Sequence, residues 1–224
     1  MRFRLYYDGP LRPNQRDPMP NQTDKLASHK HKLRQCFHRQ LKVLWETHPF
    51  LAQHKVHGPS HEEHGAQRLA GSAAGVWGHS GPDMIPLAQH VQTQHHEHGY
   101  EFIPLVRTNW HLRCAIHIVL LRCDPPGAAI HAGDIDNRVK TLIDGLRKPE
   151  SPNELTGHET PSVDETPFYC LLQDDKLITE FSVETDRLLD REPAQGHNDA
   201  KQVRAVISVD IQPLEVTTFN LAFA

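Results

Sequence analysis

The chain has 224 residues, of which 38% are hydrophobic and 23% charged, and its formal net charge is −4. These values fit a globular protein with long loops and exclude full disorder, which needs fewer apolar runs. No apolar stretch approaches the roughly 18 residues of a membrane helix, and no apolar signal-peptide core follows the N-terminus, so we expect a cytoplasmic protein. Four scattered cysteines without a C-x-x-C pair favour free thiols in a reducing compartment.

The average charge conceals an asymmetry along the chain. Residues 1–47 hold ten Lys and Arg against four Asp and Glu, whereas residues 151–199 hold three against twelve. This division predicts one basic surface and one acidic module. A basic surface is what a phosphate-rich partner would meet, so the net negative charge does not exclude nucleic acid as a ligand.

The N-terminal part predicts a strand over 1–7 and a helix over 23–47. Leucines and Phe37 recur in that helix at three- and four-residue steps, Thr23 is a suitable start, and Pro49 is a stop. The other faces carry cations that fit either contact with a DNA backbone or a solvated charged surface. They are Lys25, Lys30, Lys32, Arg34, Arg39 and Lys42.

A histidine-rich insertion at about 48–98 follows. Its "HEEH" places His61 and His64 three residues apart, whereas the zinc-protease pattern H-E-x-x-H needs a spacing of four on one helical face. We therefore interpret these residues as surface histidines. After the insertion, strands are predicted over 100–107 and 111–123, and the second becomes wholly apolar, as is typical of a strand buried on both faces.

A loop at 124–133 leads into "GDIDNRVKTLIDGL", where Val139, Leu142, Ile143 and Leu146 follow helical spacing. An acidic insertion at 148–168 comes next. Then "FYCLLQDDKLITEFSVETDRL" predicts a strand, a two-aspartate turn and a strand, and "QVRAVISVDIQPL" a final strand. We expect one α/β (α+β) domain over 1–224, with a small mixed sheet of about four or five strands and two main helices.

Two aspartates stand at the mouth of the predicted helix. Projection at 100° per residue places Asp136 and Lys140 on one flank of the apolar stripe, one turn apart, with Asp144 continuing the line. The direction of Asp134 depends on the loop. A helix N-terminus favours carboxylates, so the pair taken alone is more typical of capping than of metal binding.

The second pair, Asp174 and Asp175 in "QDDKLI", makes the metal interpretation stronger. Three carboxylates brought together repel one another unless a cation neutralises them, and an oxygen-only set suits Mg²⁺ or Mn²⁺. Dehalogenase-like phosphatases and metal-dependent glycosyltransferases also use D-x-D, but they place it directly at a strand end. Here about ten loop residues separate the strand from the motif.

The run "DIDNRVK" (134–140), followed by "QDDKLI" (173–178) in this order of elements, resembles the RusA-type Holliday-junction resolvases. "DGPLRPN" (8–14) is similar to the family's loop after the first strand. The resemblance implies a homodimeric, Mg²⁺-dependent endonuclease acting on branched double-stranded DNA. It implies that Asp134, Asp136 and Asp175 are metal ligands and that Lys140 is the catalytic lysine. Asn137 and Asp174 would be accessory.

The two insertions depart from the family pattern, because members are shorter and usually basic. The acidic insertion lies beside the expected site in sequence, where it could repel DNA, gate the site or bind another protein. Three alternatives therefore stay open. The first is a flap- or structure-specific nuclease on the same core. The second is a catalytically inactive or regulatory DNA-binding protein on the same fold, and the third is an interaction protein whose functional surface is the acidic 148–199 region.

Overall fold

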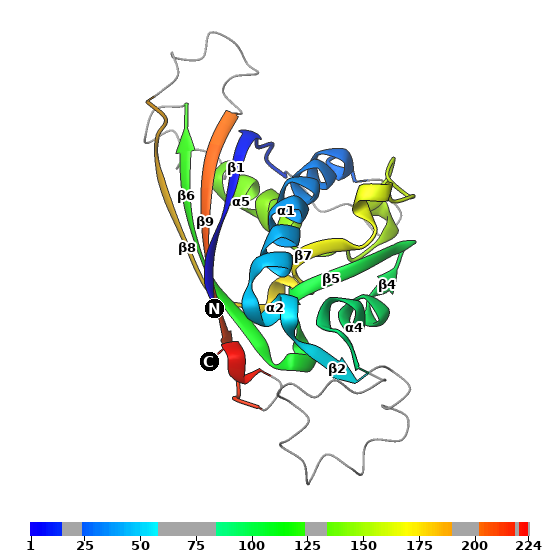
Figure 1. Ribbon diagram of the computed structural model, residues 1–224. Coiled ribbons are helices and arrows are strands. Elements are labelled where there is room, and N and C mark those ends of the chain that lie inside the picture. The colour runs from blue at the N-terminus through cyan, green and yellow to red at the C-terminus, as the bar shows by residue number, and fades with distance from the viewer. Residues whose placement is uncertain (15–23, 58–83, 124–133, 190–201, 218–219, 224) are drawn as a thin grey trace.

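The computed structural model describes residues 1–14, 24–57, 84–123, 134–189, 202–217 and 220–223 (Figure 1). The fold is mixed α+β, as expected, but its strands form several sheets instead of one. The helices are α1 (Ala27–Thr47), α2 (Pro49–Gln53), α4 (Leu87–Gln94) and α5 (Asp134–Leu146). The strands are β1 (Arg2–Pro10), β2 (Lys55–His57), β3 (Met84–Pro86), β4 (His96–Glu97), β5 (Tyr100–Val106), β6 (Leu112–Arg122), β7 (Phe168–Leu172), β8 (Ile178–Arg187) and β9 (Gln202–Pro213).

The largest sheet has the order β1-β9-β6-β8. β9 runs antiparallel to both of its neighbours, and the edge strand β8 runs parallel to β6. A second sheet has the order β4-β5-β7, with β5 and β7 parallel, and β2 pairs with β3. Helices α1 and α5 lie between the two larger sheets (Figure 1), so that one face of the four-stranded sheet is covered.

The strand β6 corrects one expectation. Its residues alternate between buried and more exposed along its whole length, so only one of its faces is covered. Apolar residues on the open face, such as Val119 and Leu121, produced the continuous apolar run in the sequence. An antiparallel sheet with one face on the core commonly leaves the other face open.

Residues from almost every element share one core. Leu33, Phe37 and Leu41 of α1 are at most 1% exposed, and they pack between the sheets with Leu142 and Leu146 of α5. Gly145 allows the two helices to approach closely, because a Cβ there would lie 2.7 Å from the Leu33 Cβ. The expected apolar stripes of both helices are therefore the buried ones.

The first helix begins later than predicted. Thr23 lies outside the described residues, and Asp24 accepts a hydrogen bond from the backbone N–H of Leu26 at 2.8 Å, so that α1 starts at Ala27. It ends at Thr47, before Pro49, as the sequence predicted. In the described part of the chain, no helix is both long enough and apolar enough to cross a membrane.

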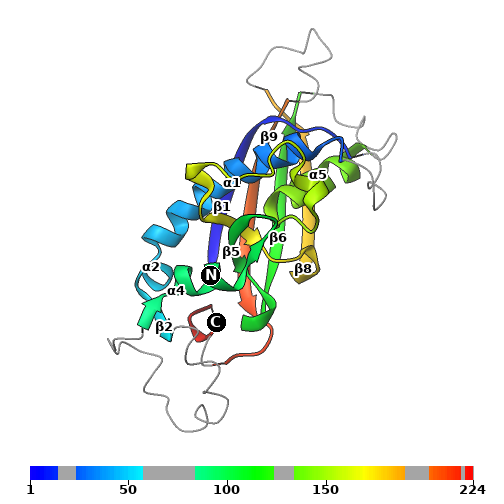
Figure 2. The same ribbon diagram turned by 90° about the vertical axis from the view of Figure 1, so that its right-hand side faces the viewer.

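The two insertions contain ordered structure. The described parts of the first include α2, β2, β3, α4 and β4, whereas His61 and His64 lie outside the described residues. The second forms two short 3-10 turns, Pro152–Leu155 and Val163–Glu165, that pack on α1. Figure 2 shows this segment running across α1 on the side away from the four-stranded sheet.

Candidate functional site

The D-x-D-N-x-x-K run forms the first two turns of α5. Asp134 begins the helix, although its side chain lies outside the described part. Asp136 and Lys140 are both exposed, one turn apart, while Val139 is 8% exposed and Leu142 is fully buried. The Asp136 carboxylate and the Lys140 side chain therefore lie on one exposed flank beside the buried stripe, as the helical projection predicted.

Asp144, the next residue on that flank, has a different environment. It is 4% exposed and pairs with Lys30 Nζ at 2.7 Å and with Arg147 Nη2 at 3.0 Å. The flank therefore turns inward after Lys140, because α1 packs over the C-terminal half of α5. Asp144 stabilises the helix pair and cannot reach a substrate.

The loop after β1 contacts the start of α5. The backbone N–H of Asn14 donates to the Asn137 carbonyl at 3.1 Å, and the Thr141 hydroxyl donates to the same oxygen at 3.0 Å. Asn14 is 5% exposed, and its side-chain Nδ2 is buried without a hydrogen-bond partner among the described residues. The side-chain amide of Asn14 is thus a donor without an acceptor, among the described residues, beside the D-x-D-N turn.

The same loop is attached to the start of α1. The backbone N–H of Arg12 donates to His29 Nε2 at 3.2 Å. Burial lowers the pKa of His29 to about 4, and the charges of Arg12 and Lys32 act in the same direction. His29 is therefore neutral at pH 7 and keeps the lone pair that accepts this hydrogen bond.

The second aspartate pair belongs to a different group of carboxylates. Among the described residues, Glu150, Asp174 and Asp175 bring one oxygen each within 4.8 Å of one another. Asp174 caps the 3-10 turn Asp175–Leu177 by accepting from the Lys176 N–H at 2.9 Å, a bond that lowers the pKa of Asp174. An all-oxygen set of this kind fits a hard divalent cation.

Cations surround this acidic group. The Arg147 guanidinium lies 3.7 Å from Glu150, and Lys176 Nζ lies 3.5 Å from Asp174. These positive charges offset part of the repulsion within the group, so its geometry does not require a metal ion.

The two aspartate motifs lie at opposite ends of the four-stranded sheet. Asn14, which contacts the start of α5, follows the end of β1 beside the C-terminal end of β6. Asp175 precedes β8, whose first residue pairs with Cys114 near the N-terminal end of β6. The eight residue steps from Cys114 to Arg122 span about 26 Å.

The structure therefore brings Asp175 together with Glu150 and Asp174, and not with Asp136. This corrects the expectation that the motifs meet within one chain. The reason is the path of β7: its last residue, Leu172, bridges Arg147 at the C-terminal end of α5, whereas Asp136 lies at the N-terminal end. The roles of Asp134 and Asp136 as metal ligands stay predictions.

The predicted DNA-binding cations divide into two groups. Lys25, Lys32, Arg39 and Lys42 are exposed, as expected of residues that contact a backbone. Lys30 is 3% exposed and forms ion pairs with Asp24 and Asp144. Arg34 is 2% exposed and forms an ion pair with Glu154. For these two residues the DNA-binding prediction is wrong, because no duplex can reach them.

The acidic insertion supplies a partner for the buried cations Arg34 and Arg147, although not for Lys30. Glu154 accepts from Arg34 Nη2 and, at 3.1 Å, from Arg147 Nη2. Glu165 accepts from Gln35 at 2.9 Å and lies 2.8 Å from His31 Nε2. The carboxylates of both glutamates are thus engaged in hydrogen bonds and ion pairs inside the fold. The insertion is less of a free acidic surface than its composition predicted.

Two members of these sites had weak signals in the sequence. Glu150 follows α5 in "KPE", but its meeting with Asp174 depends on how β7 packs, which no local pattern reveals. Asn14 lies in the Pro/Asn loop, where asparagine is common for turn formation alone.

Comparisons with protein-family models, with curated proteins and with solved structures found no match to this chain.

Proposed function

We propose that the protein is a Mg²⁺-dependent, structure-specific DNA endonuclease that cuts branched double-stranded DNA such as four-way junctions. The observation that carries the proposal is the joint exposure of Asp136 and Lys140, one turn apart on α5, while the intervening Val139 is buried. Their motif resembles that of the RusA-type resolvases. A cytoplasmic location and a homodimer, which offers two sites to paired strands, belong to the same proposal.

The proposed roles follow from the chemistry of each side chain. Asp134 and Asp136 would hold Mg²⁺ or Mn²⁺, which activates water and stabilises the leaving oxygen when it is bound. Lys140 neutralises charge on the phosphate, because an ammonium group one turn from the carboxylate can meet a phosphate oxygen. The Asn137 carbonyl accepts from the backbone N–H of Asn14 and so holds the loop after β1 beside the start of α5.

The second acidic group is a separate candidate cation site. Asp175 stays in the proposal as a metal ligand, now with Asp174 and Glu150 as its neighbours. Substitution of Asp175 tests whether this second acidic group takes part in the reaction. If Asp175→Asn abolishes cutting as completely as Asp136→Asn does, both ends of the sheet serve the reaction. If it does not, the reaction needs only the residues at the start of α5.

The exposed cations of α1 form the proposed DNA track. Lys32 and Arg39 are seven residues apart and therefore lie along one line of α1, about 10 Å from each other. Lys25 lies in the turn that precedes the helix. Lys42 lies beside this line. Contacts of this kind are made with phosphates, so they are independent of base sequence and sensitive to salt.

A second candidate function is favoured by the separation of Asp136 from Asp175. A protein that retains the fold and the basic helix but does not assemble three carboxylates would bind branched DNA without cutting it. This regulatory role predicts equal DNA affinity in Mg²⁺ and in EDTA, with no product under either condition.

The test uses purified full-length protein with end-labelled four-way junction, flap and linear duplex DNA, each in Mg²⁺ and in EDTA. Cutting of branched DNA that needs Mg²⁺ and disappears in Lys140→Ala supports the nuclease. Lys55→Ala is the matched control, because Lys55 is exposed on β2, away from α5. Binding of the junction without any product supports the regulatory role and contradicts the nuclease.

A further inference from the structure

The two edges of the four-stranded sheet differ in what covers them. At the β1 edge, the backbone N–H of Tyr6 donates to Gln40 Oε1 at 2.9 Å, and Gln40 Nε2 donates to the Tyr6 carbonyl at 2.8 Å. A side chain of α1 thus occupies the place of a neighbouring strand at the middle of this edge. β8 forms the other edge (Figure 1), and all of its residues except Ile178 and Val183 are exposed. An open strand edge is a place where another strand can add.

Every second residue of β8 turns its backbone N–H and C=O away from β6. The N–H of Leu188, the residue after the strand, donates to the carbonyl of Arg122 at the end of β6, at 2.7 Å. Because backbone groups alternate in direction along a strand, the even-numbered residues of β8 bond to β6 and the odd-numbered ones face outward. The outward groups belong to Phe181, Val183 and Thr185, and they have no hydrogen-bond partner within the described part of the chain.

The regular part of this edge has two defined ends. The register with β6 shifts once, at Thr179, which is an extra residue of β8. At the other end, the N–H of Arg187 donates to Asp186 Oδ1 at 2.6 Å, so a side chain already occupies that donor. The steps from Glu180 to Arg187 span about 23 Å, which accommodates an added segment of about six to eight residues.

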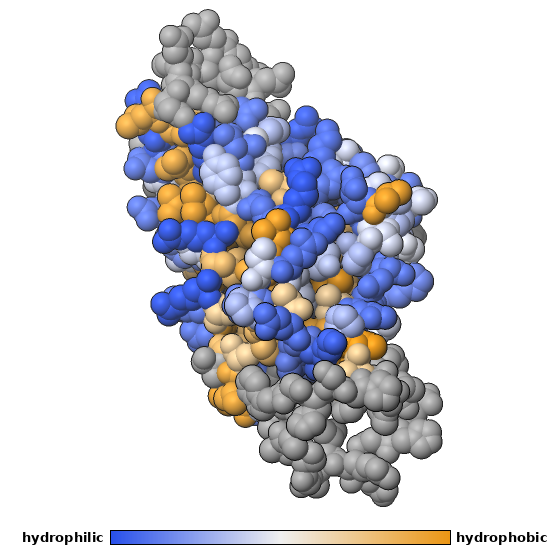
Figure 3. Space-filling view, in the orientation of Figure 1, coloured by the Kyte–Doolittle hydropathy of each residue, from blue (hydrophilic) through white to orange (hydrophobic). Residues whose placement is uncertain are grey.

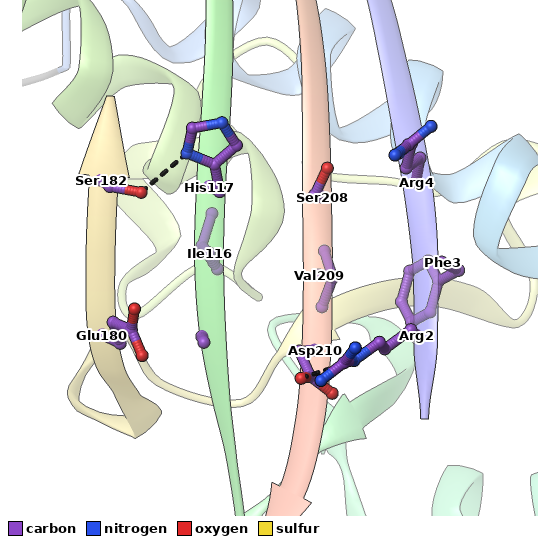
Figure 4. A pocket seen from close by; sticks show the side chains of 11 residues that line it. Arg2, Phe3, Arg4, Ile116, His117, Glu180, Ser182, Ser208, Val209 and Asp210 are labelled. Carbon is purple, nitrogen blue, oxygen red and sulfur yellow. Dashed lines mark hydrogen bonds and ion pairs between the residues drawn. The ribbon is translucent and has the colours of Figure 1, made fainter. Parts of the chain in front are cut away.

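The face of the sheet that points away from α1 and α5 is acidic at this edge. Glu180, Glu184 and Asp186 lie on it, because they follow the outward residues of β6 in the register. Figure 4 shows Glu180 and Ser182 on this face, with Ser182 bonded to His117 at 2.7 Å. His117 also lies 3.9 Å from Glu184, whereas Glu180 and Asp186 form no ion pair with any described residue. These two carboxylates are therefore available to a cationic partner.

The opposite face of the edge, on the side of the helices, offers apolar surface. Phe181 and Val183 lie on this side, in register with the buried residues Ile116 and Ile118 of β6. Phe181 is 44% exposed, although phenylalanine is most often buried. In the orientation of Figure 1, Figure 3 shows hydrophobic surface interrupted by hydrophilic surface along the side of the molecule where the sheet lies. One set of side chains of an added strand would cover Phe181.

We propose that β8 binds an extended segment of a partner protein, which adds to the four-stranded sheet beside β8. The segment carries lysine or arginine at every second residue and apolar residues between them. Its cations lie beside Glu180, Glu184 and Asp186, and its apolar side chains lie beside Phe181. Main-chain hydrogen bonds supply affinity in strand addition, and the alternate side chains supply specificity.

The charges of β8 argue against other occupants. Two copies of β8 paired antiparallel about Val183 would set Glu180 opposite Asp186, and like charges at opposed positions are destabilising. The phosphates of a nucleic acid would meet the same carboxylates, so this edge is separate from the proposed DNA track. Carboxylates on an edge strand exclude most strands, and they therefore select a basic one. β8 lies within residues 151–199, where twelve acidic residues stand against three basic ones.

The probe is a fluorescein-labelled peptide of about eight residues that alternates lysine and valine and matches the length of the regular edge. Fluorescence anisotropy with the full-length protein in EDTA, without DNA, measures its binding independently of any cleavage. We expect a Kd of about 100 μM or lower. A matched peptide that alternates glutamate and valine should bind at least about ten-fold more weakly.

N-methylated peptides separate strand addition from simple attraction between charges. N-methylation of the valines removes the N–H groups that face β8 in an antiparallel addition, and N-methylation of the lysines removes those that face it in a parallel addition. The charge is the same in both peptides. We expect one of them to lose binding at least about ten-fold, while the other binds like the parent peptide.

Variants of β8 test the same contact from the side of the protein. The double variant Glu180→Arg with Glu184→Arg should weaken binding of the lysine peptide at least about ten-fold. The matched control, Glu46→Arg with Asp164→Arg, makes the same change in net charge at exposed positions elsewhere and should bind normally. Thr185→Pro removes one outward N–H and leaves the bonds to β6 intact. It should therefore fold, as measured by circular dichroism, and bind at least about five-fold more weakly.

Three results would overturn the proposal. One is the absence of saturable binding of the lysine peptide up to about 1 mM. Another is binding that neither N-methylated peptide weakens, because attraction between charges alone would then account for it. The third is self-association of the wild type in sedimentation equilibrium that Thr185→Pro abolishes, because a second copy would then occupy the edge.

Discussion

Removal of the Glu154 carboxylate should be one of the most damaging single changes outside the apolar core. Glu154 is 7% exposed and binds Arg34, which is 2% exposed, and Arg147, which is 6% exposed. Glu154→Gln keeps the volume but leaves a buried guanidinium without its main counter-charge. Breaking a buried pair by removing one partner costs about 3–5 kcal/mol in the free energy of unfolding.

For a chain of this length, that loss corresponds to a fall in the melting temperature of about 10 °C. Urea denaturation of the wild type and of Glu154→Gln measures the free energy directly. The double variant Arg34→Met with Glu154→Gln should lose less than the single variant, because the stranded charge is gone. Asp164→Asn, in the same segment but exposed, is the matched control and should be neutral.

The reasoning would be refuted by a loss below about 1 kcal/mol in Glu154→Gln, or by strictly additive losses in the double variant. Either result would mean that the second insertion is not fastened to α1 through this pair. The packing of the insertion would then depend on its apolar contacts alone, such as that of Leu155, which is 2% exposed.

Four further predictions concern packing, pH and DNA binding. Gly145→Ala should destabilise the protein in spite of the better helix propensity of alanine, because the new Cβ would lie 2.7 Å from that of Leu33; urea denaturation measures this, and a gain in stability would contradict the close approach of the helices. Burial lowers the pKa of His31, so the unfolded chain binds the proton more readily below pH 6.5, and the free energy of unfolding should fall as the pH drops from 6.5. Burial raises the pKa of Glu165, but the hydrogen bonds from Ser162 and Gln35 and the charge of His31 together outweigh it and lower this pKa to about 2. The stabilising contribution of Glu165, present above pH 4.5, should therefore be lost between pH 4.5 and 2; denaturation from pH 7.5 to 3 that shows constant stability would contradict both assignments. Lys32→Ala should weaken junction binding and reduce the slope of log affinity against log salt by about 1, and an unchanged slope in a binding titration would remove α1 from the DNA track.

Local periodicity was sufficient to predict the two long helices, α1 and α5, and most strands, but not the elements of the histidine-rich insertion, which are α2, α4, β2, β3 and β4. The spacing of Val139, Leu142 and Leu146 predicted the buried face of α5, and the structure confirms it. Alternation in β6 was hidden because Val119 and Leu121 occupy its open face. The composition of a strand shows which residues are apolar but not how many of its faces are covered.

The buried cations could not be recognised from local sequence. Lys30 and Arg34 share a face of α1 with Phe37 and Leu41, but lysine and arginine are usually exposed. Their burial depends on Asp144 and on Glu154, which lies 120 residues beyond Arg34. Such long-range partners become visible only after the chain has folded.

The candidate site was likewise only partly predictable from the sequence. The flank shared by Asp136 and Lys140 follows from helix geometry, and the sequence predicted it correctly. The position of Asp175 depends on the direction of β7 and on the ordered insertion before it. Motif order predicted a single cluster of carboxylates, whereas packing placed Asp175 with Glu150.

The most direct test of the proposed function is the cleavage of a labelled four-way junction in Mg²⁺ by the wild type, by Asp136→Asn and by the exposed control Asp164→Asn. The account predicts that the wild type and the control cut the junction, and that Asp136→Asn binds it but loses at least about 100-fold in rate. Cleavage by a folded Asp136→Asn variant at the wild-type rate would contradict the assignment of the site to the start of α5.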